Sequence, residues 1–178
     1  MIITLIGYRG SGKSAVARPL AERLAWSWID ADAELERRAG RTIRAIFEQQ
    51  GEAEFRRLER ELLAELLQRD ELVLAAGGGA VLNADTRRDL HAAGPVVWLR
   101  APVEVLEQRI HADRTTADRR PNLTAGGGRA EIEAVLRERA PLYRECASLT
   151  IETGDADVAA VVERILSSLP EAVGRRGP

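Results

Sequence analysis

The chain has 178 residues, of which 45% are hydrophobic and 30% are charged, and its formal net charge is −2. This composition is typical of one globular domain with a sizeable core, and the small negative charge argues against nucleic-acid binding. No apolar run approaches the roughly 20 residues of a membrane span. Cys146 is the only cysteine, which argues against a disulfide framework and a cysteine metal site. The chain begins on a strand-like run without a signal peptide, so we expect a cytoplasmic protein, and we expect a monomer.

Strand-like and helix-like segments alternate along the chain. Short apolar runs predict strands at residues 1–6, 26–30, 72–76, 96–99 and 149–152. Apolar residues at helical spacing predict helices at 14–24, 32–39, 42–50, 52–68, 85–92, 103–111, 129–145 and 158–169. Pro19 lies inside the first helix and is expected to kink it without ending it. The alternation predicts an α/β fold with a parallel sheet covered on both faces, in one domain over residues 1–169, followed by a disordered tail over 170–178.

The most specific motif follows the first strand. Residues 7–14 match the phosphate-binding pattern G-x-x-x-x-G-K-[ST] at every fixed position. Lys13 is the only lysine of the chain, and its compact ammonium can reach between the β- and γ-phosphates of a nucleotide. The hydroxyl of Ser14 is expected to bind Mg²⁺. The phosphate-binding residues are expected to be Gly10, Ser11, Gly12, Lys13, Ser14 and Ala15.

Two acids, Asp30 and Asp32, stand at the end of the second strand. Ligands of a parallel α/β sheet lie beyond the carboxyl ends of its strands. One carboxylate can therefore help to hold Mg²⁺ through water, while the other accepts hydrogen bonds from substrate hydroxyls. The alternative is that Asp32 only caps the helix that follows.

Two further segments offer groups for an anionic acceptor. Arg56 lies next to an apolar stripe and can point into a cleft, whereas Arg57 points further outward. The alternative is a solvated ladder of charge pairs such as Glu52–Arg56. The triplet Gly77, Gly78 and Gly79 follows the third strand, where a ligand can approach backbone N–H groups closely. A flexible turn is the alternative for the triplet, although turns rarely need three consecutive glycines.

Residues 113–128 show no apolar period and predict a long loop. Loops of this length in a compact domain are usually lids or disordered. Arg120 lies in this segment, and an arginine on a lid can close over a transferring phosphoryl group. Together with the other motifs, the loop predicts phosphoryl transfer to a small hydroxylated carboxylate. The motifs do not indicate a nucleobase as the acceptor, because a nucleobase would need an aromatic or amide-lined pocket.

In these motifs and in their order, the chain resembles the shikimate kinases. The resemblance covers about residues 1–168 and rests on residues 7–14, 30–32, 51–56 with Glu59, 77–79, 120–121 and 139–143. It implies a three-layer nucleoside-monophosphate-kinase-like (P-loop kinase) fold with strand order 2-3-1-4-5. It places the substrate-binding region at about residues 31–62 and the lid at about 113–128. The implied reaction is the ATP-dependent phosphorylation of the 3-hydroxyl of shikimate, a step of aromatic amino-acid biosynthesis.

The resemblance also implies roles for single residues. Asp32 would hold shikimate hydroxyls, and Arg56, Arg139 and the glycine triplet at 77–79 would hold the shikimate carboxylate. Asp30 and Ser14 would serve Mg²⁺.

The remaining roles concern catalysis and the nucleotide. Arg120 would reach both ATP and substrate from the lid, and either Arg109 or Arg114 would pack on adenine. Lys13, Asp32 and Arg120 are the expected catalytic residues. Two alternatives stay open, namely a gluconate-type or nucleotide kinase of the same fold and a catalytically silent nucleotide-binding regulator.

Overall fold

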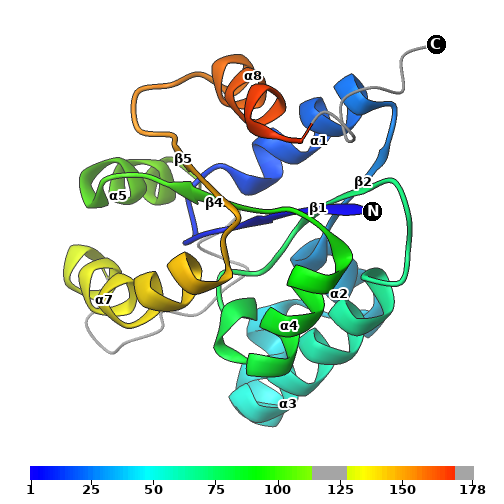
Figure 1. The fold of residues 1–178 in the computed structure, drawn as a ribbon. Coiled ribbons are helices and arrows are strands. Elements are labelled where there is room, and N and C mark those ends of the chain that lie inside the picture. Colours follow the sequence, from blue (N-terminus) through cyan, green and yellow to red (C-terminus); the bar gives the residue numbers. More distant parts are fainter. Residues whose placement is uncertain (114–127, 171–178) are drawn as a thin grey trace.

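The computed structural model describes residues 1–113 and 128–170, which form a parallel sheet with helices on both faces (Figure 1). The sheet has five strands in the order β2-β3-β1-β4-β5, as predicted. The strands are β1 Ile2–Ile6, β2 Ser27–Asp30, β3 Leu72–Ala75, β4 Val96–Arg100 and β5 Leu149–Glu152. Most of the expected lid, with Arg114 and Arg120, lies outside the described residues, and so does the expected tail from residue 171 onward.

The central strand β1 pairs with β3 on one side and with β4 on the other. Every residue of β1 and β3 is buried. Their continuous apolar sequences follow from this position, because a parallel sheet is covered on both faces. Ala75 of β3 lies beside Leu5 of β1 and beside Asp30 of β2. The loops that leave the carboxyl ends of these three strands therefore start from neighbouring points.

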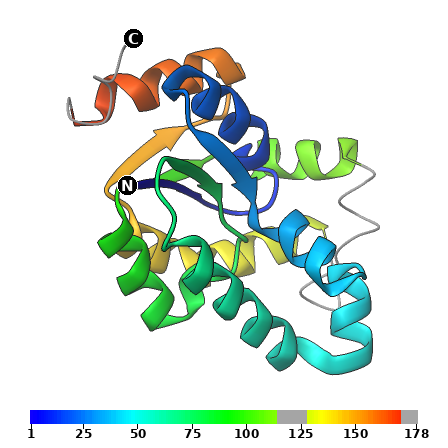
Figure 2. The same ribbon diagram turned by 90° about the vertical axis from the view of Figure 1, so that its right-hand side faces the viewer.

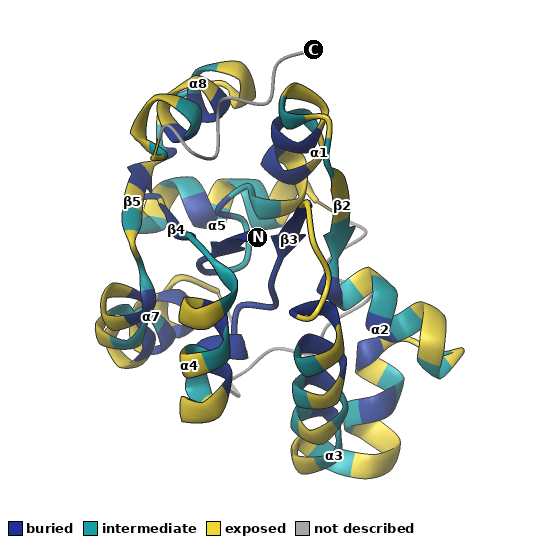
Figure 3. Ribbon diagram, turned by 45° about the vertical axis from the view of Figure 1, so that its right-hand side comes forward, coloured by how far each residue is buried: buried dark blue, intermediate teal, exposed yellow. Residues whose placement is uncertain are grey.

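Helices cover both faces of the sheet (Figures 1 and 2). One face packs against α1 and α8, for example through Leu20 and Ile165. The other face packs against α2, α3, α4 and α7, for example through Leu63 and Tyr143, and Figure 3 shows the buried residues of these helices. The helices are α1 Lys13–Leu24, α2 Ala31–Ala39, α3 Ile43–Leu66, α4 Ala84–Ala93, α5 Val103–Ala112, α7 Gly128–Cys146 and α8 Val158–Ser168, with a short 3₁₀ helix η1 at Ala80–Leu82.

Two helices show how single residues shape their course. α3 is kinked at Gly51, whose φ of 83° and ψ of 171° are not helical. This backbone conformation favours glycine, and it separates the two helices that the sequence predicts at 42–50 and 52–68. Pro19 lies inside α1, which continues to Leu24 as expected. In the described part of the chain, none of the helices has both the length and the hydropathy of a bilayer span.

Candidate active site

The phosphate-binding loop connects β1 to α1. Gly12 caps α1 with a φ of 96°, a conformation that favours glycine. Gly7 cannot carry a side chain, because a Cβ there would lie 2.4 Å from the carbonyl oxygen of Leu99. The loop therefore packs directly on the end of β4.

Lys13 lies at the first position of α1 and folds back over the loop. Its Nζ donates hydrogen bonds to the carbonyl oxygens of Gly7, at 2.8 Å, and of Tyr8, at 3.0 Å. These contacts hold the only ammonium side chain of the protein beside the loop backbone. A helix N-terminus and a lysine together form an anion-binding site.

Asp30, and not Asp32, caps α2. Asp30 Oδ1 accepts hydrogen bonds from the backbone N–H groups of Asp32, at 3.0 Å, and Ala33, at 3.1 Å. The alternative that Asp32 is the cap is therefore wrong, because α2 begins at Ala31 and places Asp32 inside the first turn. The other oxygen of Asp30 accepts a hydrogen bond from the hydroxyl of Ser14. The two predicted Mg²⁺ residues are thus in contact.

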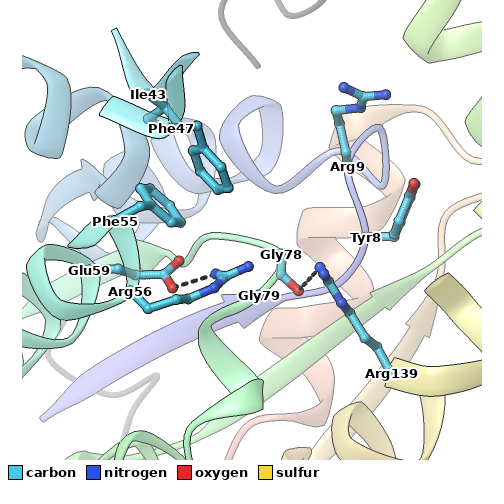
Figure 4. A pocket seen from close by; sticks show the side chains of 10 residues that line it. All are labelled: Tyr8, Arg9, Ile43, Phe47, Phe55, Arg56, Glu59, Gly78, Gly79 and Arg139. Carbon is cyan, nitrogen blue, oxygen red and sulfur yellow. Dashed lines mark hydrogen bonds and ion pairs between the residues drawn. The ribbon is translucent and has the colours of Figure 1, made fainter. Parts of the chain in front are cut away.

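A second pocket lies beside the phosphate loop, and Figure 4 shows the side chains that line it. Arg56 Nη1 pairs with Glu59 Oε2 at 2.7 Å, and Arg56 Nη2 pairs with Glu52 Oε1 at 3.1 Å. The side chain of Arg56 is 24% exposed, whereas that of Arg57 is 53% exposed. The structure therefore places Arg56 in the pocket and Arg57 in a solvated charge ladder. The lining residues are Tyr8, Arg9, Ile43, Phe47, Phe55, Arg56, Glu59, Gly78, Gly79 and Arg139.

The glycine triplet lies against charged side chains of α2 and α3. A Cβ at Gly79 would lie 2.3 Å from Arg56 Nη1. A Cβ at Gly77 would lie 2.6 Å from Glu59 Oε1 and 3.0 Å from Asp32 Oδ1. The triplet is thus more than a flexible turn, because larger residues would displace these groups. The distances at Gly77 also show that the carboxylates of Asp32 and Glu59 flank this residue.

Arg139 reaches the same pocket from α7 and is only 7% exposed. Its Nη1 donates to the carbonyl oxygen of Gly78 at 3.2 Å, and the Tyr143 hydroxyl donates to that oxygen as well. Arg139 Nε is buried and has no hydrogen-bond partner among the described residues. A buried guanidinium with an unused donor is suited to bind a carboxylate. The pocket thus has one arginine on each side of the glycine triplet.

Glu59 also lines this pocket, although no site role was predicted for it, because it occurs in a run of charged residues. It is buried. Burial raises the pKa of Glu59, while the positive charge and hydrogen bond of Arg56 act in the opposite direction. The sequence carried one usable signal, since Glu59 stands three residues after Arg56 and three before the buried Leu62. Tyr8, Ile43 and Phe47 also line the pocket without having been predicted.

Arg109 lies on the other side of the phosphate loop. Its Nη2 donates to the carbonyl oxygens of Thr153, at 2.6 Å, and Gly154, at 3.2 Å. Thr153 in turn donates from Oγ1 to the carbonyl oxygen of Ser11 at 3.1 Å. The loop after β5 and the phosphate loop are therefore joined beside Arg109. The other arginine predicted to pack on adenine, Arg114, lies outside the described residues.

This fold and this arrangement define a P-loop phosphotransferase with a small acceptor. The phosphate loop, Asp30 and Asp32 line one cleft, and the pocket with Arg56 and Arg139 opens next to it. Phosphoryl transfer between two bound molecules requires such adjacent sites, because catalysis depends on positioning and charge stabilisation.

Comparison with known proteins gives the family. The shikimate kinase family model matches residues 9–170. The shikimate kinase of Thermobifida fusca is 44% identical over 171 residues, which are 96% of this chain and 96% of that protein. Among solved structures, the Acinetobacter baumannii shikimate kinase in complex with shikimate has 42% sequence identity to this chain. The two structures superpose with a TM-score of 0.87 over 93% of this chain and 90% of that chain. The Aquifex aeolicus shikimate kinase structure is 34% identical, with a TM-score of 0.79 over 99% of this chain and 100% of that chain. The chain belongs to the shikimate kinase family.

Proposed function

We infer that the protein transfers the γ-phosphoryl group of ATP to the 3-hydroxyl of shikimate. The observation that carries this function is the pocket beside the phosphate loop, in which Arg56 and Arg139 approach the glycine triplet from opposite sides. Two guanidinium groups suit a carboxylate. Asp32, which lines the neighbouring cleft, suits the hydroxyls of a cyclic acid. Shikimate carries both kinds of group.

The transfer step needs few protein groups. The oxygen of the 3-hydroxyl forms a bond to the γ-phosphorus, while the bond from that phosphorus to the bridging oxygen breaks and its electron pair leaves with ADP. Asp32 orients the hydroxyl and accepts its proton late in the step. Lys13 neutralises charge on the phosphoryl oxygens. We propose that Arg120 joins it there from the lid and that either Arg109 or Arg114 packs on adenine.

Mg²⁺ is expected to enter with ATP. Ser14 and Asp30 offer a hydroxyl and a carboxylate that already contact each other. These hard oxygen donors fit a cation that keeps several waters and takes one or two protein ligands along with phosphate oxygens. When bound, the ion supplies positive charge to the β- and γ-phosphates. Ser14 and Asp30 are the residues that would hold it, Asp30 through water.

One assay tests the function against its rivals. ADP formation is measured in a coupled assay with shikimate, quinate or gluconate as the acceptor, and also without acceptor. We expect turnover to be fastest with shikimate and slow without acceptor. Faster turnover with gluconate would indicate a gluconate-type kinase, and ATP binding without turnover on any acceptor would indicate a regulator. Size-exclusion chromatography tests the expected monomer, and cell fractionation tests the expected cytoplasmic location.

A further inference from the structure

Arg9 is the third residue of the phosphate loop and stands at a variable position of the motif. We propose that Arg9 is a further catalytic residue, whose guanidinium binds the phosphoryl group during its transfer and on the product. This inference rests on the proposed function. Arg9 would add a second cation to the lysine that the phosphate-binding motif provides, at a position that the motif leaves variable.

The position of Arg9 is the first argument. Arg9 lines both the acceptor pocket and the cleft of the phosphate loop, and Ile43 is the other residue common to the two linings. In Figure 4, Arg9 lies across the pocket from Phe55 and Arg56. Its backbone nitrogen would be 3.8 Å from a Cβ at Gly78, so the loop at Arg9 runs next to the glycine triplet. A phosphoryl group that moves from nucleotide to acceptor must pass between the two cavities that Arg9 borders.

The charge of Arg9 is the second argument. Among the described residues, Arg9 has no hydrogen-bond or ion-pair partner, and it is partly buried. The neighbouring cations, in contrast, have partners. Arg56 is paired with Glu59 and Glu52, and Lys13 is held by carbonyl oxygens. A partly buried guanidinium that pairs with no carboxylate in the described part of the chain raises the local positive potential there and favours the approach of an anion.

The chemistry of phosphoryl transfer indicates which anion binds to Arg9. The carboxylate of the acceptor is expected between Arg56 and Arg139, on the glycine triplet. The anion that reaches the junction beside Arg9 is the phosphoryl group, whose three equatorial oxygens carry charge throughout the transfer. A guanidinium can bind two of these oxygens at once. After transfer, the same contact holds the phosphate monoester of the product.

If Arg9 binds the transferred phosphoryl group, its loss should affect the ligand that carries this phosphate and spare the others. Loss of Arg9 should weaken binding of shikimate 3-phosphate and lower kcat, but it should leave the binding of shikimate and of ADP nearly unchanged. A residue that binds the carboxylate or the hydroxyls of the acceptor would affect shikimate as well. A residue that binds the nucleotide would affect ADP.

The experiment compares Arg9→Met with wild type and with Arg144→Met. Arg144 is a suitable control because it is an exposed arginine of α7 without a partner among the described residues. Titration calorimetry measures the binding of shikimate, shikimate 3-phosphate and ADP, and the coupled assay measures kcat. For Arg9→Met we expect about a tenfold loss of affinity for shikimate 3-phosphate, changes of less than about twofold for shikimate and ADP, and a fall in kcat of roughly 10- to 100-fold. Arg9→Lys should recover part of kcat, and Arg144→Met should resemble wild type.

Three results would overturn the proposal. Equal losses of affinity for shikimate and for shikimate 3-phosphate would show that Arg9 binds shikimate itself and not the transferred phosphoryl group. A matching loss of affinity for ADP would show that Arg9 binds the nucleotide, and no loss in any measurement would show that Arg9 is a solvated charge without a role in transfer. If wild type itself did not phosphorylate shikimate, the proposed function would fail, and that outcome is visible without any variant.

Discussion

Replacing Gly79 by alanine tests the acceptor pocket with one methyl group. The backbone of Gly79, with φ −102° and ψ 0°, is accessible to alanine, so the change introduces no backbone strain. The new Cβ would lie 2.3 Å from Arg56 Nη1 and 2.6 Å from Arg56 Nη2. Because carbon and nitrogen normally stay more than 3 Å apart, the guanidinium must move by about 1 Å. The obstacle is the end of a flexible side chain, so we expect the protein to remain folded.

The magnitude follows from the contact that is displaced. A hydrogen bond between charged groups contributes about 1.5–3 kcal/mol, and each 1.4 kcal/mol corresponds to about a factor of ten in affinity. Gly79→Ala should therefore raise the KM for shikimate roughly 10- to 100-fold. The affinity for ADP should not change, because Gly79 does not line the cleft of the phosphate loop.

The assay combines steady-state kinetics with a double-mutant cycle. If the methyl group acts through Arg56, the variant with both Gly79→Ala and Arg56→Ala should be no worse than Arg56→Ala alone. Thermal unfolding of each variant controls for loss of fold. Additive effects in the cycle, or an unchanged KM in Gly79→Ala, would refute the reasoning.

Three further predictions concern charged residues. Lys13→Ala should lower kcat by about 10³-fold or more, because it removes a phosphate-directed cation, and the protein should remain folded. Its melting temperature should fall slightly, since the carbonyl oxygens of Gly7 and Tyr8 lose the hydrogen bonds of this ammonium. Near-normal turnover in the coupled assay would contradict the assignment. Arg56→Lys should raise the KM for shikimate strongly, whereas Arg57→Lys should have little effect, since only Arg56 lines the pocket; equal effects would count against the site. Hydrogen bonds from two arginines of α2 lower the pKa of Glu34 to about 2. Glu34→Gln should therefore lower the free energy of unfolding by about 1 kcal/mol at neutral pH. The difference between the variant and wild type should shrink as the pH falls from about 4.5 to about 2, because protonation of Glu34 removes the same interaction from wild type. Urea unfolding of both proteins across this range measures the effect, and a difference independent of pH would show that the carboxylate charge is not its source.

The sequence was sufficient for the motifs whose chemistry is local. The phosphate loop at residues 7–14 is recognisable because its glycines, Lys13 and Ser14 act within one short segment and one helix N-terminus. The alternation of strands and helices gave the fold class, since a parallel sheet needs a crossover between strands. Arg56 and Arg57 could be told apart because their positions on α3 differ relative to one apolar stripe.

The tertiary structure decided which distant groups meet. The position of Glu59 depends on α3 crossing the loop after β3, which buries its carboxylate against Gly77. Arg109 and Thr153 lie far apart along the chain, and only the pairing of β4 with β5 brings them together beside the phosphate loop. The cap of α2 also required the structure, because Asp30 and Asp32 are equally suitable by residue type. Side-chain chemistry can be read from the sequence, whereas burial and partnership arise from contacts between elements that are separated along the chain.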